Sequence, residues 1–306
     1  MRKTFVNTLT EIAREDQRVV VVTPDMGFSI FEKFREEFPK RIYNTGIAEQ
    51  NSIGIAAGLA LIGKVVYVYS IVPFVTMRPF EQVRVDVCYQ NLPVKLVGSG
   101  GGLTYGTLGP THHSIEDISL MRSLPNMSVF CPGDPVESEL CTRAVHALPG
   151  PAFLRLGKGS GEPVVHTAHK SNLSVDMPIS LKEGSDATIL STGNMLQNAV
   201  LASEILEKKG ISCGVVSVPK VKPLNENSII TLAEKTPLFT LEEHSVIGGL
   251  GSAVAGILAE SDVTSKFSRI ALPDRFCKEV GSQTYLREMN GLSAEKIANK
   301  ILLSIK

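Results

Sequence analysis

The sequence lacks an excess of either charge, since 31 lysine and arginine residues balance 31 aspartate and glutamate residues. A chain without net charge has no general attraction for nucleic acid or for an anionic membrane surface, so we expect neither as a partner. It also lacks an apolar run long enough to cross a bilayer, and no apolar segment follows the N-terminal Met1-Arg2-Lys3-Thr4 as it would in a signal peptide. These absences favour a cytoplasmic protein.

Cysteine is scarce as well. The five cysteines are scattered and form no Cys-x-x-Cys pair, which argues against a disulfide framework and against a zinc site. No Gly-x-x-x-x-Gly-Lys-Ser/Thr segment occurs, and the glycine-rich stretch from Gly98 to Gly102 does not have the spacing of a dinucleotide-binding loop. The sequence therefore gives no sign of a nucleotide site, or of a metal site made by this chain alone.

What the sequence does contain is an alternation of short β-branched runs and longer helical stretches, the pattern of parallel sheets with crossover helices. Nearly continuous apolar strands indicate burial on both faces of a sheet. We predict an α/β fold of two doubly wound, parallel-sheet domains, with boundaries at residues 1–165 and 185–306 and a linker over residues 166–184.

The first domain is predicted to hold strands at Val19–Val22, Val65–Tyr69, Val94–Val97, Met127–Phe130 and near Phe153–Leu156. Its helices are predicted at Thr4–Arg14, Gln50–Leu61, Arg78–Tyr89, Ile115–Arg122 and Pro135–Ala147. The second domain is predicted to hold strands at Thr188–Ser191, Gly214–Val218 and Leu238–Leu241, and helices at Met195–Lys209 and Ser252–Glu260.

Glu49 follows a glycine-containing turn and opens a predicted helix. The apolar positions of this helix share one face, made of Ile53, Ala56, Ala57, Ala60 and Leu61. A glutamate in a first helical turn usually only complements the helix dipole. Here the turn stands between a buried strand and an apolar helix, so we expect an inward-pointing carboxylate, which needs a partner or a proton. Thiamine diphosphate uses such a group, because a carboxyl bound to its aminopyrimidine nitrogen stabilises the imino form that deprotonates the thiazolium carbon.

Two adjacent histidines, His112 and His113, follow Gly109-Pro110-Thr111 and precede a predicted helix with Ser114 as its N-cap. A single histidine at such a place usually caps a helix or fills space. A metal site is disfavoured because no third ligand is spaced with the pair. In a chain with six histidines, two together favour proton transfer or hydrogen bonding to a substrate oxygen.

Several segments, in their order and spacing, resemble the pyrimidine-binding domain of the transketolase family, which includes 1-deoxyxylulose-5-phosphate synthases and the β subunits of 2-oxo-acid dehydrogenases. They are Arg78–Val83, Gln90–Val94, Gly109–His113, Met121–Met127 and Cys131–Pro135. The remainder, with Glu242–Gly251, is similar to the C-terminal domain of the same family.

The resemblance implies a thiamine-diphosphate-dependent transferase of two-carbon ketol units. It implies that Glu49 activates the cofactor and that His112 lies over the thiazolium near the reacting carbonyl. It also implies contacts to the cofactor from Ile47, Phe74 and Arg78, and contacts to the substrate from His113, Arg155 and Asp25, with Arg155 as the phosphate-binding arginine.

Transketolase relatives hold the diphosphate through a divalent metal bound by a Gly-Asp-Gly segment and a downstream asparagine. This chain contains no Gly-Asp-Gly. The resemblance therefore implies a naturally split C-terminal subunit that pairs with an N-terminal, diphosphate-binding subunit, in an α2β2 heterotetramer. That partner would hold Mg²⁺ or a similar ion.

Two positions depart from the sugar-phosphate transketolases. Gly100 stands where those enzymes have a histidine, and Leu108 stands where they have an acidic residue. Both groups normally touch sugar hydroxyls, so we expect a modified sugar substrate. The alternatives are a 2-oxo-acid decarboxylating subunit, a deoxyxylulose-phosphate-synthase-like subunit, or a non-catalytic scaffold subunit. Retention of Glu49 and His112 argues against the scaffold.

Overall fold

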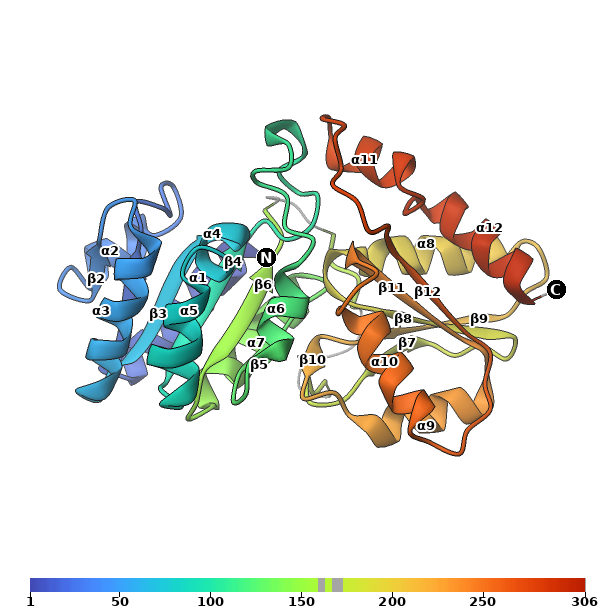
Figure 1. Cartoon of the computed structure of the whole chain (residues 1–306), viewed down its shortest axis with the longest axis horizontal. Coiled ribbons are helices and arrows are strands. Elements are labelled where there is room, and N and C mark those ends of the chain that lie inside the picture. The colour runs from blue at the N-terminus through green and yellow to red at the C-terminus, as the bar shows by residue number, and fades with distance from the viewer. Residues whose placement is uncertain (159–162, 167–172, 306) are drawn as a thin grey trace.

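The computed structural model describes residues 1–158, 163–166 and 173–305. Two α/β units lie side by side along the long axis of the molecule, the first blue to green and the second yellow to red in Figure 1. The predicted α/β fold is confirmed, because each unit is built on a mainly parallel sheet covered by helices. Within the described residues, no helix combines the length and the apolar character needed to cross a membrane.

The first unit holds, among the described residues, a seven-stranded sheet in the order β10-β5-β6-β4-β3-β1-β2. Its strands are β1 (Val19–Thr23), β2 (Ile42–Asn44), β3 (Val65–Ile71), β4 (Val94–Ser99), β5 (Ser128–Phe130), β6 (Ala152–Leu156) and β10 (Lys220–Lys222). Neighbouring strands pair in parallel except β10, which comes from the second half of the chain and pairs antiparallel with β5. The sheet edge next to the second unit is therefore shared between the two halves of the sequence.

Helices cover both faces of this sheet, because successive residues of a strand point to opposite sides. Val20 and Val22 belong to an apolar cluster with α3 (Glu49–Leu61), the π-helix η1 (Val83–Tyr89) and α6 (Asp117–Ser123). Val19 and Val21 belong to another cluster with α1 (Arg2–Glu15), α2 (Glu32–Glu37) and α7 (Pro135–Ala147). The shorter helical segments are α4 (Val72–Thr76), α5 (Phe80–Gln82) and η2 (Gly106–Leu108).

The second unit has a five-stranded sheet in the part of the chain that is described, ordered β12-β11-β8-β9-β7. Its strands are β7 (Ile179–Lys182), β8 (Ala187–Ser191), β9 (Cys213–Ser217), β11 (Leu238–Ser245) and β12 (Phe267–Leu272), with β7 antiparallel to β9. Helices α8 (Leu196–Glu207) and α12 (Ala294–Ile305) pack on one face. Helices α9 (Glu226–Lys235) and α10 (Leu250–Ala259) pack on the other, where the apolar core continues into the first unit. Helix α11 (Gln283–Met289) and η4 (Gly193–Met195) complete this unit.

The helix predicted at Arg78–Tyr89 begins later than expected. It starts as α5 at Phe80 and continues as η1, so Arg78 lies in the connection from α4. The residue before a proline is disfavoured in the helical region, and Pro79 imposes this restriction on Arg78. Arg78 therefore lies outside the helix.

Three further details differ from the sequence predictions. Helix α6 begins at Asp117 rather than after Ser114, because the backbone of Ser114 pairs with Gly102 in an isolated β-bridge and does not cap the helix. Leu61 is 63% exposed, although the rest of the predicted apolar face of α3 is buried. The strand β7 lies inside the predicted linker of residues 166–184, of which residues 167–172 lie outside the described part of the chain.

Candidate active site

The carboxyl ends of the parallel strands of the first sheet meet at one edge, which is where open α/β sheets bind ligands. Glu49 follows β2, Phe74 and Arg78 follow β3, and His112 follows β4. The topology therefore gathers residues that are far apart in the sequence.

Glu49 is the first residue of α3 and is only 7% exposed, which confirms that it points inward. Its carboxylate accepts hydrogen bonds from Arg78 Nη1 at 3.1 Å to Oε1 and 3.2 Å to Oε2. The Arg78 side chain is 50% exposed. The buried carboxylate thus has one charged partner, and that partner reaches it from the solvent side.

Phe74 joins Arg78 to His112. The Arg78 guanidinium carbon lies 4.1 Å from the centroid of the Phe74 ring, and the His112 ring packs against Phe74 edge-on at 5.2 Å. Phe74 stands in the short helix α4, which the sequence prediction did not include, directly beyond the end of β3. The structure therefore brings Glu49, Arg78, Phe74 and His112 into one cluster.

His112 lies partly exposed in the loop between η2 and α6. Thr111 Oγ1 lies 2.9 Å from its Nδ1, which leaves Nε2 as the nitrogen that can meet a substrate. Burial lowers the pKa of His112, and the positive charges of Arg78 and Lys158 lower it further. At neutral pH the ring is therefore uncharged and able to accept a proton.

The second unit holds the base of the His112 loop. The backbone N–H of Leu103 donates to Glu243 Oε1 at 2.6 Å, and Gln283 Nε2 donates to Thr104 Oγ1 at 3.2 Å. Glu243 is buried and forms an ion pair with Arg287 of α11. The C-terminal unit therefore positions the His112 loop, which belongs to the first unit.

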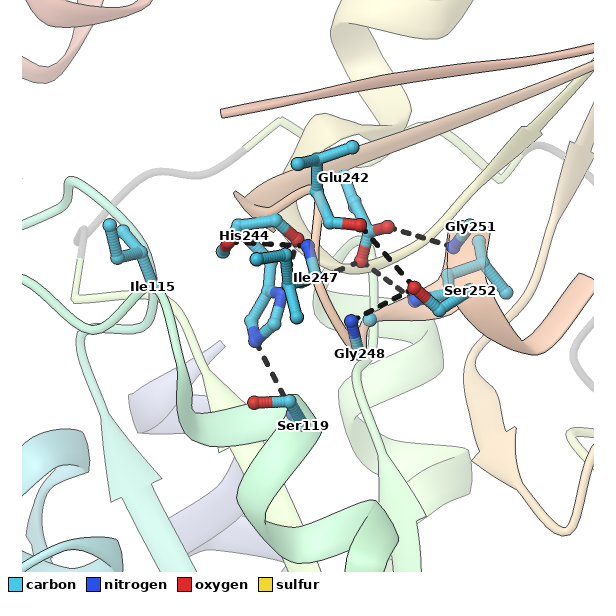
Figure 2. A network of polar contacts seen from close by, with 12 residues as sticks. Ile115, Ser119, Glu242, His244, Ile247, Gly248, Gly251 and Ser252 are labelled. Atoms are coloured by element: carbon cyan, nitrogen blue, oxygen red, sulfur yellow. Dashed lines mark hydrogen bonds and ion pairs between the residues drawn. The ribbon is translucent and has the colours of Figure 1, made fainter. Parts of the chain in front are cut away.

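Contacts between the two units fix their relative position, as Figure 2 shows. The backbone N–H of Ser119 in α6 donates to Nε2 of the buried His244, whose Nδ1 lies 2.8 Å from the carbonyl oxygen of Ser245. Glu242 accepts hydrogen bonds from the N–H groups of Leu250 and Gly251 at the start of α10. The Glu242–Gly251 segment, singled out in the sequence, thus builds the interface between the units.

The structure does not bring His113 to the surface of the site. His113 is 5% exposed, burial lowers its pKa, and neither ring nitrogen has a hydrogen-bond partner among the described residues. Substrate contact predicted for His113 would require the loop to rearrange. His112 is the histidine of the pair that is available.

The phosphate contact predicted for Arg155 stays a prediction. Its guanidinium is buried within β6 and donates to Asp117 Oδ2 at 2.7 Å and to the carbonyl oxygens of Ser114 and Glu243. These bonds use Nε and Nη2, and the described residues give Nη1 no hydrogen-bond acceptor. The cation that the sequence analysis missed is Lys158, partly exposed just beyond β6, whose Nζ lies 4.2 Å from the Tyr105 ring centroid.

Asp25 and Ile47 flank the Glu49 turn without touching the cluster. Asp25 is exposed, and its Oδ1 accepts a hydrogen bond from Asn44 Nδ2 at 2.9 Å, while Asn44 Oδ1 accepts one from the N–H of Gly46. Asp25 thus braces the turn that leads into α3. Ile47 is 77% exposed, so its side chain is open to a cofactor or to another chain.

An inward carboxylate, an aromatic ring and a neutral histidine at the carboxyl edge of a doubly wound sheet are the parts of a pyrimidine-binding half-site of a thiamine-dependent enzyme. Residues 1–163 match the model of the family "Transketolase, pyrimidine binding domain", and residues 179–297 match "Transketolase, C-terminal domain". The chain belongs to the transketolase family, whose domains imply dependence on thiamine diphosphate.

The relatives include separate transketolase subunits. The chain is 39% identical to the 6-deoxy-6-sulfo-D-fructose transketolase subunit SqwH of a Clostridium species, over 97% of this chain and 92% of that one. It is 37% identical to an apulose-4-phosphate transketolase subunit of Phocaeicola vulgatus, over 89% of this chain and 87% of that one. Among solved structures, it is similar to a split gene transketolase described as an inactive β4 tetramer, with a TM-score of 0.88, 34% identity and coverage of 99% and 97%.

Proposed function

We propose that this chain is the C-terminal subunit of a heteromeric, thiamine-diphosphate-dependent transketolase that transfers a two-carbon ketol unit to or from a modified, anionic sugar. The observation that carries the proposal is the contact between Glu49, Arg78 and Phe74 at the ligand edge of the first sheet. The family membership and the separate transketolase subunits among its relatives support it.

The residues present fit the aminopyrimidine ring of the cofactor. The Arg78 guanidinium is a planar group that donates N–H bonds to Glu49 and lies over the face of Phe74. An aminopyrimidine is also planar, bears N–H groups and stacks on an aromatic ring. The Arg78 guanidinium therefore occupies the position that we assign to the aminopyrimidine ring of the cofactor. Because the Arg78 side chain is half exposed, it can turn outward into solvent when the cofactor binds.

When bound, thiamine diphosphate supplies the carbon nucleophile that retains the two-carbon unit. Glu49 holds a proton at the pyrimidine ring nitrogen, and Phe74 stacks on that ring. His112 Nε2 takes the proton of the donor's C3 hydroxyl when the C2–C3 bond of the ketose breaks, and returns a proton to the acceptor oxygen. Lys158 holds the anionic end of the sugar.

The relatives' names favour a charged and unusual sugar. One names a sulfonated deoxy ketose and another a phosphate ester of apulose. Sulfonate and phosphate are both anions that a lysine ammonium binds as a point charge. Lys158 lies over the Tyr105 ring, near enough to His112 for its charge to lower the pKa of that histidine, and it suits either anion.

The proposed partner is an N-terminal, diphosphate-binding subunit that also holds the divalent metal. In the described part of the chain, no group of three or more histidine, cysteine, aspartate or glutamate side chains is arranged to hold a metal ion. Apolar side chains at and around α3 and η1 are exposed: Ile47, Ile55, Leu61, Ile62 and Tyr89. We assign this surface to the subunit interface, in an α2β2 assembly.

The function is tested by mixing the chain with the N-terminal transketolase subunit of the same organism, thiamine diphosphate and Mg²⁺. We expect ketol transfer from a ketose phosphate to an aldose phosphate in the mixture, and none from either subunit alone. Decarboxylation of a 2-oxo acid without ketol transfer would refute the proposal and favour the dehydrogenase-type alternative.

A further inference from the structure

Tyr105 fills the space in which position 100 would otherwise place a side chain. A Cβ added to Gly100 would lie 2.0 Å from Tyr105 Cε2 and 2.4 Å from Cδ2, and Gly100 has a φ of +83°. The Tyr105 side chain is well packed, since the residue is only 6% exposed. Gly100 and Tyr105 are therefore two parts of one arrangement, in which an aromatic ring takes the space of the missing polar side chain.

The Tyr105 ring contacts two groups of the proposed pocket. Lys158 Nζ lies 4.2 Å from the ring centroid, and the His112 ring centroid lies 5.9 Å away at an interplanar angle of 52°. Phe74 meets His112 from another direction at 5.2 Å. His112 thus contacts two aromatic rings, and Lys158 lies over one of them.

These contacts restrict both polar groups. A cation over an aromatic face is attracted by the negative charge of the ring face, and this attraction grows as water is excluded. A histidine in contact with two rings has few rotamers available, because neighbouring side chains occupy the other positions. The ring therefore fixes the Lys158 ammonium at the edge of the pocket and keeps His112 pointed into it.

We propose that Tyr105 is a positioning residue that sets substrate specificity, an inference that rests on the proposed function. Its ring holds Lys158 and His112, and the apolar face of that ring takes the place of the polar side chain that sugar-phosphate transketolases have at position 100. The substrate class is a ketose whose anion meets Lys158 and which carries no hydroxyl where it meets the Tyr105 ring.

The chemistry of ketol transfer limits which hydroxyl group the donor ketose can lack. When the C2–C3 bond of the donor breaks, its electron pair stays with the two-carbon unit, and the C3 hydroxyl loses its proton to become the carbonyl of the released aldehyde. The C3 oxygen is therefore required. The position without a hydroxyl lies at C4 or beyond, which makes 4-deoxy-xylulose 5-phosphate a suitable probe beside xylulose 5-phosphate itself.

The test compares kcat/KM for these two donors in the reconstituted enzyme. We expect the wild type to prefer the 4-deoxy donor by about tenfold or more, a difference of about 1.4 kcal/mol. Tyr105→Val removes the ring, so the preference should fall toward one and KM should rise more than kcat falls. Tyr105→Phe keeps the ring and should keep the preference. A Val variant with the wild-type preference, or a Phe variant that loses it, would overturn the proposal.

A second measurement separates this proposal from the proposed function. In the chain alone, proton NMR follows the titration of His112, assigned with a His112→Gln variant. Because burial and the charges of Arg78 and Lys158 hold the pKa of His112 low, releasing Lys158 by Tyr105→Val should raise that pKa, while Tyr105→Phe should leave it unchanged. An unchanged titration in the Val variant contradicts the positioning role, whereas a reconstituted wild type that transfers neither donor refutes the proposed function.

Discussion

Replacing Glu49 by glutamine separates the catalytic use of this carboxylate from its structural use. Glutamine has the same shape and still offers Oε1 to Arg78, so the fold should be kept. Because the Arg78 side chain is 50% exposed, its ion pair with Glu49 contributes about 0–1 kcal/mol. We expect the midpoint of thermal unfolding to fall by no more than about 2–4 °C, the change that 1 kcal/mol produces in a domain of about 150–250 residues.

The effect of Glu49→Gln on catalysis should be much larger, because glutamine cannot hold a proton at the pyrimidine nitrogen. Proton transfer by a positioned side chain contributes about 10²–10⁴-fold, so kcat of the reconstituted enzyme should fall by about that factor with little change in KM. Glu226→Gln is the matched control, since Glu226 is likewise the first residue of a helix but is exposed. Turnover of the Glu49 variant close to that of the Glu226 variant would refute the catalytic assignment.

Three further perturbations test other parts of the account. Burial lowers the pKa of His112 most, and the charge of Lys158 lowers it further. Lys158→Met removes this charge, so the pKa of His112 should rise and the acid limb of the kcat/KM profile should move to higher pH. An unmoved limb would exclude Lys158 from the site. Arg155→Met leaves the buried carboxylate of Asp117 unpaired and should lower the free energy of urea unfolding by about 3–5 kcal/mol; a stable variant with a raised KM would favour the predicted phosphate-binding role instead. Burial opposes the charge on His166, but its hydrogen bond and ion pair with Glu137 raise its pKa. Its stabilising contribution is therefore full below the unfolded pKa of about 6.5 and is lost as pH rises through the higher folded value. His166→Gln should remove this fall in stability above about pH 6.5, and an unaltered pH dependence would argue against the pair.

The fold and the centre of the site follow from local patterns. Continuous apolar strands alternating with helices predicted both sheets, and the turn before α3 predicted an inward Glu49. Helix α12 was missed although its buried residues Ala294, Ile297, Ala298 and Ile301 have the spacing of one helical face. Extending the search for helical periodicity to residues 294–305 would have predicted this helix.

The surroundings of the two cations at the end of β6 could not be predicted from local sequence patterns. Arg155 and Lys158 are three positions apart at the end of β6, and the sequence does not say which one faces the pocket. The decision depends on Asp117, which takes the Arg155 guanidinium, and on Tyr105, which takes the Lys158 ammonium. Both partners come from other segments, so tertiary packing decides the surroundings of each cation.

The central claim is that this chain supplies the pyrimidine half of a thiamine diphosphate site that a second chain completes. The most direct test is calorimetric titration of thiamine diphosphate with Mg²⁺ into this chain, into its N-terminal partner and into their equimolar mixture. We predict saturable binding in the mixture and poor binding to this chain alone. Magnesium-dependent binding of about micromolar strength by this chain alone, on the order of 8 kcal/mol, would contradict the account.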